Sequence, residues 1–191
     1  MRIIGGLLKR RKLYFPKTRA TRPVTDRAKE TIFNVLGTVC EEALVLDLFA
    51  GSGSLGIEAL SRGANHVDFV DSEKPAYSCI HRNLEALGLA GQGRIMTIPV
   101  LEAIKSLEKQ GKTFNLIFLD PPHNKGLIKK VLRQIDHSDI VTTSGIIIVG
   151  RSNHESLPPN LNTLYLQREI KIGQAFVCLL ARQETGGSVE K

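Results

Sequence analysis

Apolar residues recur along the chain in short runs, and these runs alternate with segments of helical periodicity. Buried strands are expected at residues 43–49, 67–70, 94–98, 115–119 and 146–149. Helices are expected between them, at residues 55–62, 75–87, 101–109 and 126–135. Alternation of this kind predicts an α/β fold, in which a mostly parallel sheet is covered by helices on both faces.

The front of the chain departs from this alternation. Residues 2–15 alternate weakly around two glycines, which favours a short hairpin, and residues 16–25 contain two prolines, which favours an extended basic loop. Thr25 or Asp26 is expected to cap a helix that runs to about Leu36.

The end of the chain departs from it as well. Two strand-like runs, 164–172 and 174–181, are joined at Gly173, which predicts an antiparallel hairpin. The expected division is an N-terminal extension, one α/β domain and a loose tail, over residues 1–25, 26–184 and 185–191.

Charge is distributed unevenly between the front of the chain and the rest. Residues 1–29 contain ten Lys or Arg and a single acid, Asp26, for a net charge of +9, whereas the remaining chain carries −2. A near-neutral body with a basic front is typical of a protein that binds a polyanion such as nucleic acid. The alternative is a solvated leader that binds nothing.

Composition excludes several other classes of protein. No apolar run approaches the roughly 20 residues needed to cross a bilayer, and the first residues do not resemble a signal peptide. Cys40, Cys79 and Cys178 are widely spaced and show no metal-type pairing. We therefore expect a cytoplasmic protein with free thiols, no metal site and no membrane contact.

A glycine-rich turn follows the first expected strand. It reads Asp47-Leu48-Phe49-Ala50-Gly51-Ser52-Gly53-Ser54-Leu55-Gly56. Glycines allow a tight turn and a close approach to a ligand, and the helix that follows offers free N–H groups. Asp71 ends the second expected strand, where a carboxylate can accept both hydroxyl groups of a ribose. The pattern predicts a nucleoside site, which a dehydrogenase would share.

Asp47 distinguishes this turn from a dinucleotide site. A carboxylate within the turn would repel a pyrophosphate, but it would attract the ammonium group of an amino acid. The ligand is therefore expected to be a nucleoside that carries an amino acid.

Asp120-Pro121-Pro122-His123 follows the apolar run 116–119. Two prolines fix the backbone and remove two N–H donors, which leaves carbonyl groups in set directions. Asp120 and the carbonyl of Pro121 can each accept one N–H of an exocyclic amine on a base. The lone pair of that amine would then face a methyl donor, and the carboxylate would stabilise the positive charge that develops on nitrogen.

Together these motifs resemble the amino-methyltransferases, and more closely the RsmD family of bacterial small-subunit ribosomal RNA guanine-N2 methyltransferases. The similarity covers nearly the whole chain, and its most specific part is the leader, which other amino-methyltransferases lack. The segments that resemble the family are residues 2–6, 11–13, 22–34, 46–64, 83–84 and 120–122.

The resemblance implies a Rossmann-like, seven-stranded sheet and S-adenosylmethionine as cofactor. It also implies that the substrate is guanine in the 16S RNA of an assembling small ribosomal subunit, and we expect a monomer. The implied cofactor residues are Asp47, Phe49, Gly51, Ser52, Gly53, Asp71 and Leu101, and the implied catalytic residues are Asp120, Pro121 and Pro122. The expected RNA contacts are His123, Arg10, Arg11, Arg22 and Arg27.

The sequence departs from the family pattern at three places. His123 replaces an aromatic residue that stacks on the target base, so the stacking area is smaller. Leu101 lies where the family has a polar residue near the adenine amine, and Arg151 lies where the family tends toward an acid. The alternatives are an adenine-N6 methyltransferase on nucleic acid and an RNA-binding assembly factor that has lost catalysis.

Overall fold

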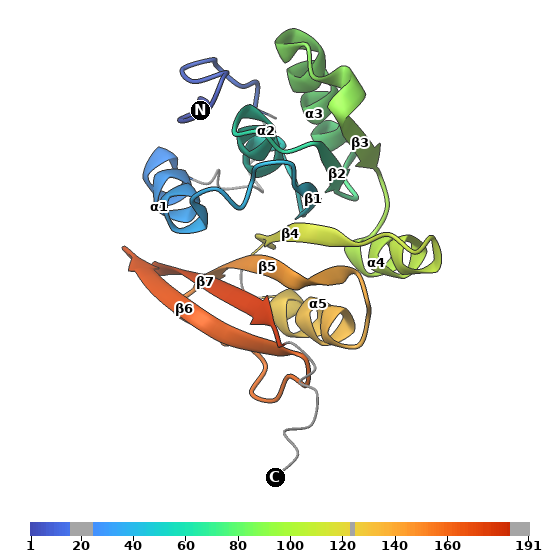
Figure 1. Cartoon of the computed structure of the whole chain (residues 1–191). Helices are drawn as coiled ribbons and strands as arrows, with labels where there is room; N and C mark the ends of the chain where they lie inside the picture. Colours follow the sequence, from blue (N-terminus) through green and yellow to red (C-terminus); the bar gives the residue numbers. More distant parts are fainter. Residues whose placement is uncertain (16–24, 123–124, 184–191) are drawn as a thin grey trace.

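The computed structural model describes residues 1–15, 25–122 and 125–183 (Figure 1). The strands are β1 (Leu44–Leu48), β2 (His66–Val70), β3 (Gly93–Met96), β4 (Phe114–Leu119), β5 (Val141–Ser152), β6 (Leu164–Ile172) and β7 (Ala175–Arg182). The helices are α1 (Asp26–Leu36), α2 (Ser54–Ser61), α3 (Lys74–Leu87), the short 3₁₀ helix η1 (Ala90–Gln92), α4 (Val100–Lys109) and α5 (Leu127–Asp136).

The strands form one sheet in the order β3-β2-β1-β4-β5-β7-β6. Strands β1 to β5 run parallel, and β7 lies antiparallel between β5 and β6. The Rossmann-like sheet of seven strands and the antiparallel hairpin at its end are therefore confirmed.

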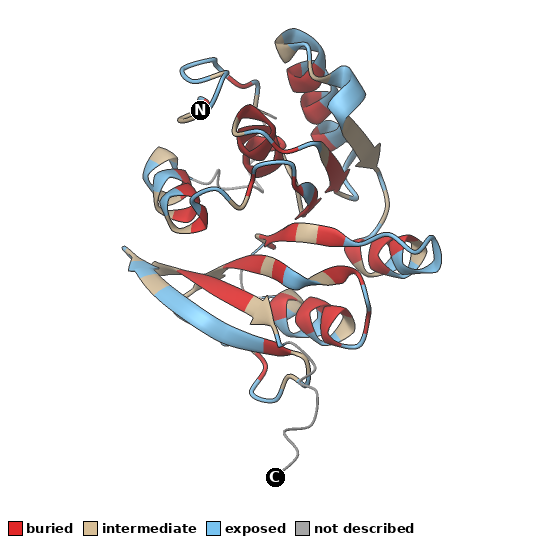
Figure 2. Cartoon of the chain, in the orientation of Figure 1, coloured by how far each residue is buried: buried red, intermediate tan, exposed pale blue. Residues whose placement is uncertain are grey.

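Helices cover both faces of the sheet. Helices α1, α2 and α3 lie on one face, and α4 and α5 lie on the other (Figure 1). Strands β1, β2 and β4 are buried almost throughout because each has helices on both faces, whereas the edge strand β6 is mostly exposed (Figure 2). The parallel strands therefore read as continuous apolar runs in the sequence.

Two strands differ from the sequence prediction by more than one residue at an end. Strand β5 begins at Val141 and not at Ile146: Val141 pairs with Phe114 of β4, and the register shifts before Ile146 pairs with Leu116. Strand β3 ends at Met96, two residues earlier than expected. The helix predicted from Asp26 to Leu36 is confirmed, and the hydroxyl of Thr25 caps it by accepting the N–H of Ala28 at 3.2 Å.

Residues 1–15 pack against the domain. Ile3 is fully buried in the core, and the backbone N–H groups of Ile4 and Gly5 donate to the carboxylate of Glu58 at 2.9 and 2.7 Å. Among these residues, the expected hairpin is reduced to a single antiparallel bridge between Arg2 and Lys12. The part of the leader that the structure describes is thus attached to α2.

The structure confirms the prediction of free thiols. Cys40, Cys79 and Cys178 are free and buried. Among the described residues, no helix combines the length and the apolar character that a membrane span requires.

Candidate active site

Three carboxylates meet at one edge of the sheet. Asp47 lies within β1, Asp71 directly follows β2, and Asp120 directly follows β4. Strand β1 pairs with both β2 and β4, so the ends of these three strands are neighbours. The carboxyl edge of an open parallel sheet is where such folds bind their ligands.

The glycine-rich turn connects β1 to α2 at this edge. Gly51 and Gly53 have φ angles of 55° and 75°, in the left-handed region that glycine adopts without strain. Phe49 also has a positive φ, 60°, which is uncommon for a residue with a side chain. Ser52, between the glycines, is buried. The turn thus has a backbone conformation that few sequences permit.

Asp71 joins the glycine turn to the loop after β2. Its Oδ2 accepts the N–H of Gly51 at 2.9 Å, and its Oδ1 accepts the N–H of Glu73 at 2.9 Å. Each carboxylate oxygen has a further lone pair. Asp71 can therefore accept further hydrogen bonds, such as those from two adjacent hydroxyl groups, while it holds the turn.

Asp47 is almost completely buried, with 2% of its surface exposed. Its Oδ2 accepts the N–H of Gly56, in the first turn of α2, at 2.9 Å. Burial raises the pKa of Asp47 to about 7; the hydrogen bond from Gly56 opposes this shift, and the charges of Asp120 and Asp71 add to it. A cation bound at this edge would relieve the mutual repulsion of the three carboxylates.

Asp120 lies against strand β5. A β-carbon at residue 150 would lie 2.2 Å from its Oδ1, so the absence of a side chain at Gly150 makes room for the carboxylate. Pro121 is buried and Pro122 is exposed, so the first proline anchors the loop and the second faces solvent. His123 lies outside the described residues.

An apolar surface borders the turn on the α4 side of the sheet. Phe49, Met96, Ile98 and Leu101 are partly buried and pack against the same apolar cluster. The side chain of Gln134 donates to the carbonyl of Leu101 at 2.9 Å and so fixes the first turn of α4. Partly buried apolar side chains are suited to contact the flat face of an adenine.

Asn83 is not among the expected site residues, and it entered the sequence analysis only as part of a segment that resembles the family. It is buried on α3, and its amide nitrogen donates to the carbonyls of Ser52 at 3.0 Å and Tyr14 at 3.1 Å. Its oxygen accepts the N–H of Tyr14 at 2.7 Å. Asn83 therefore connects the glycine turn to the N-terminal segment.

The expected RNA contacts occupy different places. Arg10, Arg11 and Arg27 are exposed, and Arg11 donates to the carbonyl of Ala86 at 3.1 Å. Arg22 lies outside the described residues.

Lys29 also belongs to the basic front of the sequence, but it is fully buried. Its ammonium group donates to Glu58 at 3.2 Å and to the carbonyl of Arg2. Lys29 therefore stabilises the fold, and its charge is not available to a polyanion.

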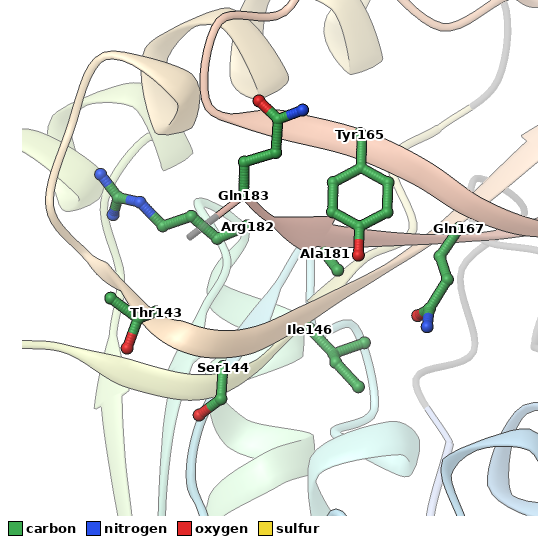
Figure 3. A pocket seen from close by; sticks show the side chains of 8 residues that line it. All are labelled: Thr143, Ser144, Ile146, Tyr165, Gln167, Ala181, Arg182 and Gln183. Carbon is green, nitrogen blue, oxygen red and sulfur yellow. The ribbon is translucent and has the colours of Figure 1, made fainter. Parts of the chain in front are cut away.

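A hollow of about 510 Å³ lies elsewhere, on β5, β6 and β7 (Figure 3). Its lining includes Thr143 and Ser144 near the start of β5 and Tyr165 at the start of β6. Because β5 runs parallel to β4, this hollow lies toward the edge of the sheet opposite the three carboxylates. It is therefore separate from the candidate active site.

Comparison with known proteins places the chain in a family. Residues 1–181 match the family described as "Conserved hypothetical protein 95". The Escherichia coli protein named ribosomal RNA small subunit methyltransferase D is 35% identical, over 98% of this chain and 93% of its own length.

Solved structures of other proteins are similar to this chain as well. The structure of the Escherichia coli protein yhhF, assigned as a methyltransferase, has a TM-score of 0.83 and 32% identity, and covers 96% of this chain and 98% of its own. The structure of SMU.776, a complex with SAH, has a TM-score of 0.67 and 17% identity. The match covers 81% of this chain and 49% of SMU.776, and it shows that the two proteins share a fold. On the sequence match along nearly its whole length, the chain belongs to the RsmD family of ribosomal RNA small subunit methyltransferases.

Proposed function

We propose that this protein transfers a methyl group from S-adenosylmethionine to the exocyclic N2 amine of a guanine in small-subunit ribosomal RNA. The observation that carries the proposal is the position of Asp120, directly after β4 and beside both the glycine turn and Gly150. Family membership supports ribosomal RNA as the substrate. We further propose that the protein acts as a monomer on RNA within an assembling subunit.

The residues at the carboxyl edge fit S-adenosylmethionine. Asp71 would accept the ribose hydroxyls, and the apolar side chains of Phe49 and Leu101 would contact the adenine. Gly51 to Gly53 would lie along the methionine part, with Asp47 favouring its ammonium group. When bound, the cofactor supplies an electrophilic methyl group on a cationic sulfur.

Asp120 and the Pro-Pro turn would orient the acceptor amine. Asp120 would accept one N–H and the carbonyl of Pro121 the other, which leaves the nitrogen lone pair aimed toward the cofactor side of the site. The negative charge of Asp120 would favour the positive charge that develops on nitrogen during transfer. The buried ring of Pro121 would hold this acceptor pair in one orientation.

The test is methyl transfer to small-subunit particles and RNA from cells that lack the gene. The modified nucleoside is identified by mass spectrometry, and N2-methylguanosine is expected. Asp120→Ala removes an acceptor and a charge, so turnover should fall by about 10²–10³-fold while cofactor affinity is retained. Methylation at adenine N6, or full activity of Asp120→Ala, would overturn the proposal.

A further inference from the structure

Helix α3 presents aromatic and cationic side chains on its outer face. Tyr77 and His81, one helical turn apart, have ring centroids 5.9 Å apart and planes inclined by 28°. On the neighbouring stripe, the guanidinium of Arg82 lies 3.5 Å from the ring centroid of Tyr14. These four residues are called the α3 patch below.

The α3 patch is exposed to solvent. Tyr14 and Tyr77 are each 44% exposed, which is a large fraction for a tyrosine ring in a folded domain. His81 and Arg82 are exposed as well. The opposite face of α3 carries the buried residues that pack on the sheet.

Cations surround the α3 patch. Lys74 begins the helix, and Arg11 bonds to the carbonyl of Ala86 near its end, so the basic run Lys9 to Lys12 lies beside the same helix. Including Arg82, these segments contribute six Lys and Arg side chains, against two glutamates at positions 73 and 85. The local charge therefore favours a polyanion.

The α3 patch also lies close to the candidate active site. Helix α3 begins three residues after Asp71, the expected ribose ligand. Tyr14 is bound through both its backbone N–H and its carbonyl to Asn83, which also donates to Ser52 of the glycine turn. From Lys74 to Ala86, the helix extends for about 18 Å, which is enough to follow a few nucleotides.

We propose that the α3 patch binds a single-stranded segment of the RNA substrate next to the target nucleotide. Unstacked bases would stack on Tyr77 and His81, and phosphates would contact Arg82 and the basic run. Stacking on aromatic side chains combined with a cationic track is the usual way in which proteins hold single-stranded RNA. A partner protein could bind the aromatic side chains without the neighbouring cations, so the combination of the two favours RNA. The inference rests on the RNA methylation proposed above.

Substitutions of the aromatic and of the cationic residues of the α3 patch should have different effects on RNA binding. Tyr77→Ala/His81→Ala should weaken binding to purified small-subunit RNA by about tenfold without changing the slope of log affinity against log salt. Arg82→Ala should flatten that slope by about 0.7, whereas Arg82→Lys should retain it. Cofactor affinity should stay at the wild-type value in all three.

Tyr165→Ala is the matched control, because Tyr165 is 43% exposed on β6, in the hollow of Figure 3. It should bind RNA like the wild type, and thermal melts verify that each variant is folded. Unchanged RNA affinity in Tyr77→Ala/His81→Ala would overturn the inference. So would loss of methylation on particles with unchanged binding to free RNA, because the partner would then be a protein. Absence of methylation by the wild type would instead contradict the proposed function.

Discussion

Gly150→Ala gives a direct test of how the fold positions Asp120. The added β-carbon would lie 2.2 Å from Oδ1 of Asp120, whereas ordinary contacts between such atoms begin at about 3.4 Å. The backbone at residue 150 cannot retreat easily, because Gly150 pairs with Val177 on one side and the preceding residue pairs with β4 on the other. The carboxylate must therefore move, by about 1 Å.

A displacement of this size should reduce catalysis. Misplacing a reacting group by about 1 Å can lower the rate by about 10²-fold, so single-turnover methyl transfer by Gly150→Ala should fall by that order. Cofactor affinity, measured by calorimetry, should stay within about twofold of wild type, since the proposed ribose ligand Asp71 is bound to a different loop.

Gly91→Ala is the control for Gly150→Ala, because a β-carbon at residue 91 would meet no other atom within 4 Å. Wild-type turnover in Gly150→Ala would show that Asp120 can rotate away without loss, and would refute the positioning role of β5. Equal losses of turnover and cofactor affinity would show that the substitution damages the whole carboxyl edge.

Three further predictions concern the remaining charges. Lys29→Met should lower the free energy of unfolding by about 3 kcal/mol in urea titrations, because Glu58 is fully buried and would lose one of its cationic partners; an unchanged midpoint would contradict this. Burial raises the pKa of Asp47 from 3.8 to about 7, so between these pH values the folded state retains a proton that the unfolded chain releases. This retained proton contributes at most about 4 kcal/mol to the free energy of unfolding, and the contribution should be lost as pH rises from 4 to 7. Asp47→Asn should remove that part of the pH dependence, and identical wild-type and variant profiles would exclude it. Arg10→Ala/Arg11→Ala should flatten the salt dependence of RNA binding by about 1–2 and leave cofactor affinity unchanged; an unaltered slope would mean that neither arginine contacts a phosphate.

The sheet could be predicted because its strands are buried on both faces. Runs such as 116–119 are apolar at every position, and a turn residue or a helix start follows each of them. The start of β5 could not be predicted in this way, because Thr143 and Ser144 are polar and exposed and give no apolar signal. The burial pattern of an element therefore determines whether it can be predicted from the sequence.

Side-chain partners across the chain could not be predicted in the same way. Arg151 lies where the family tends toward an acid, and its guanidinium bonds to Glu169 at 2.7 Å and stacks on Phe176 at 4.0 Å. Lys29 was included in the basic front, yet it pairs with Glu58, 29 residues away. Neither partner is adjacent in sequence, so charge counting alone overstates the number of free cations.

Two side chains of the domain, Glu58 and Asn83, hold the backbone of the N-terminal segment. Its backbone donates two N–H groups to a carboxylate on α2, and Asn83 accepts and donates at Tyr14 while it also donates to the glycine turn. Replacing Glu58 or Asn83 by an apolar residue would leave these partly buried backbone groups without partners, at a cost of about 1–3 kcal/mol each. The segment that begins the basic surface is therefore tied, through the side chains of Glu58 and Asn83, to α2 and to the turn proposed to hold the cofactor.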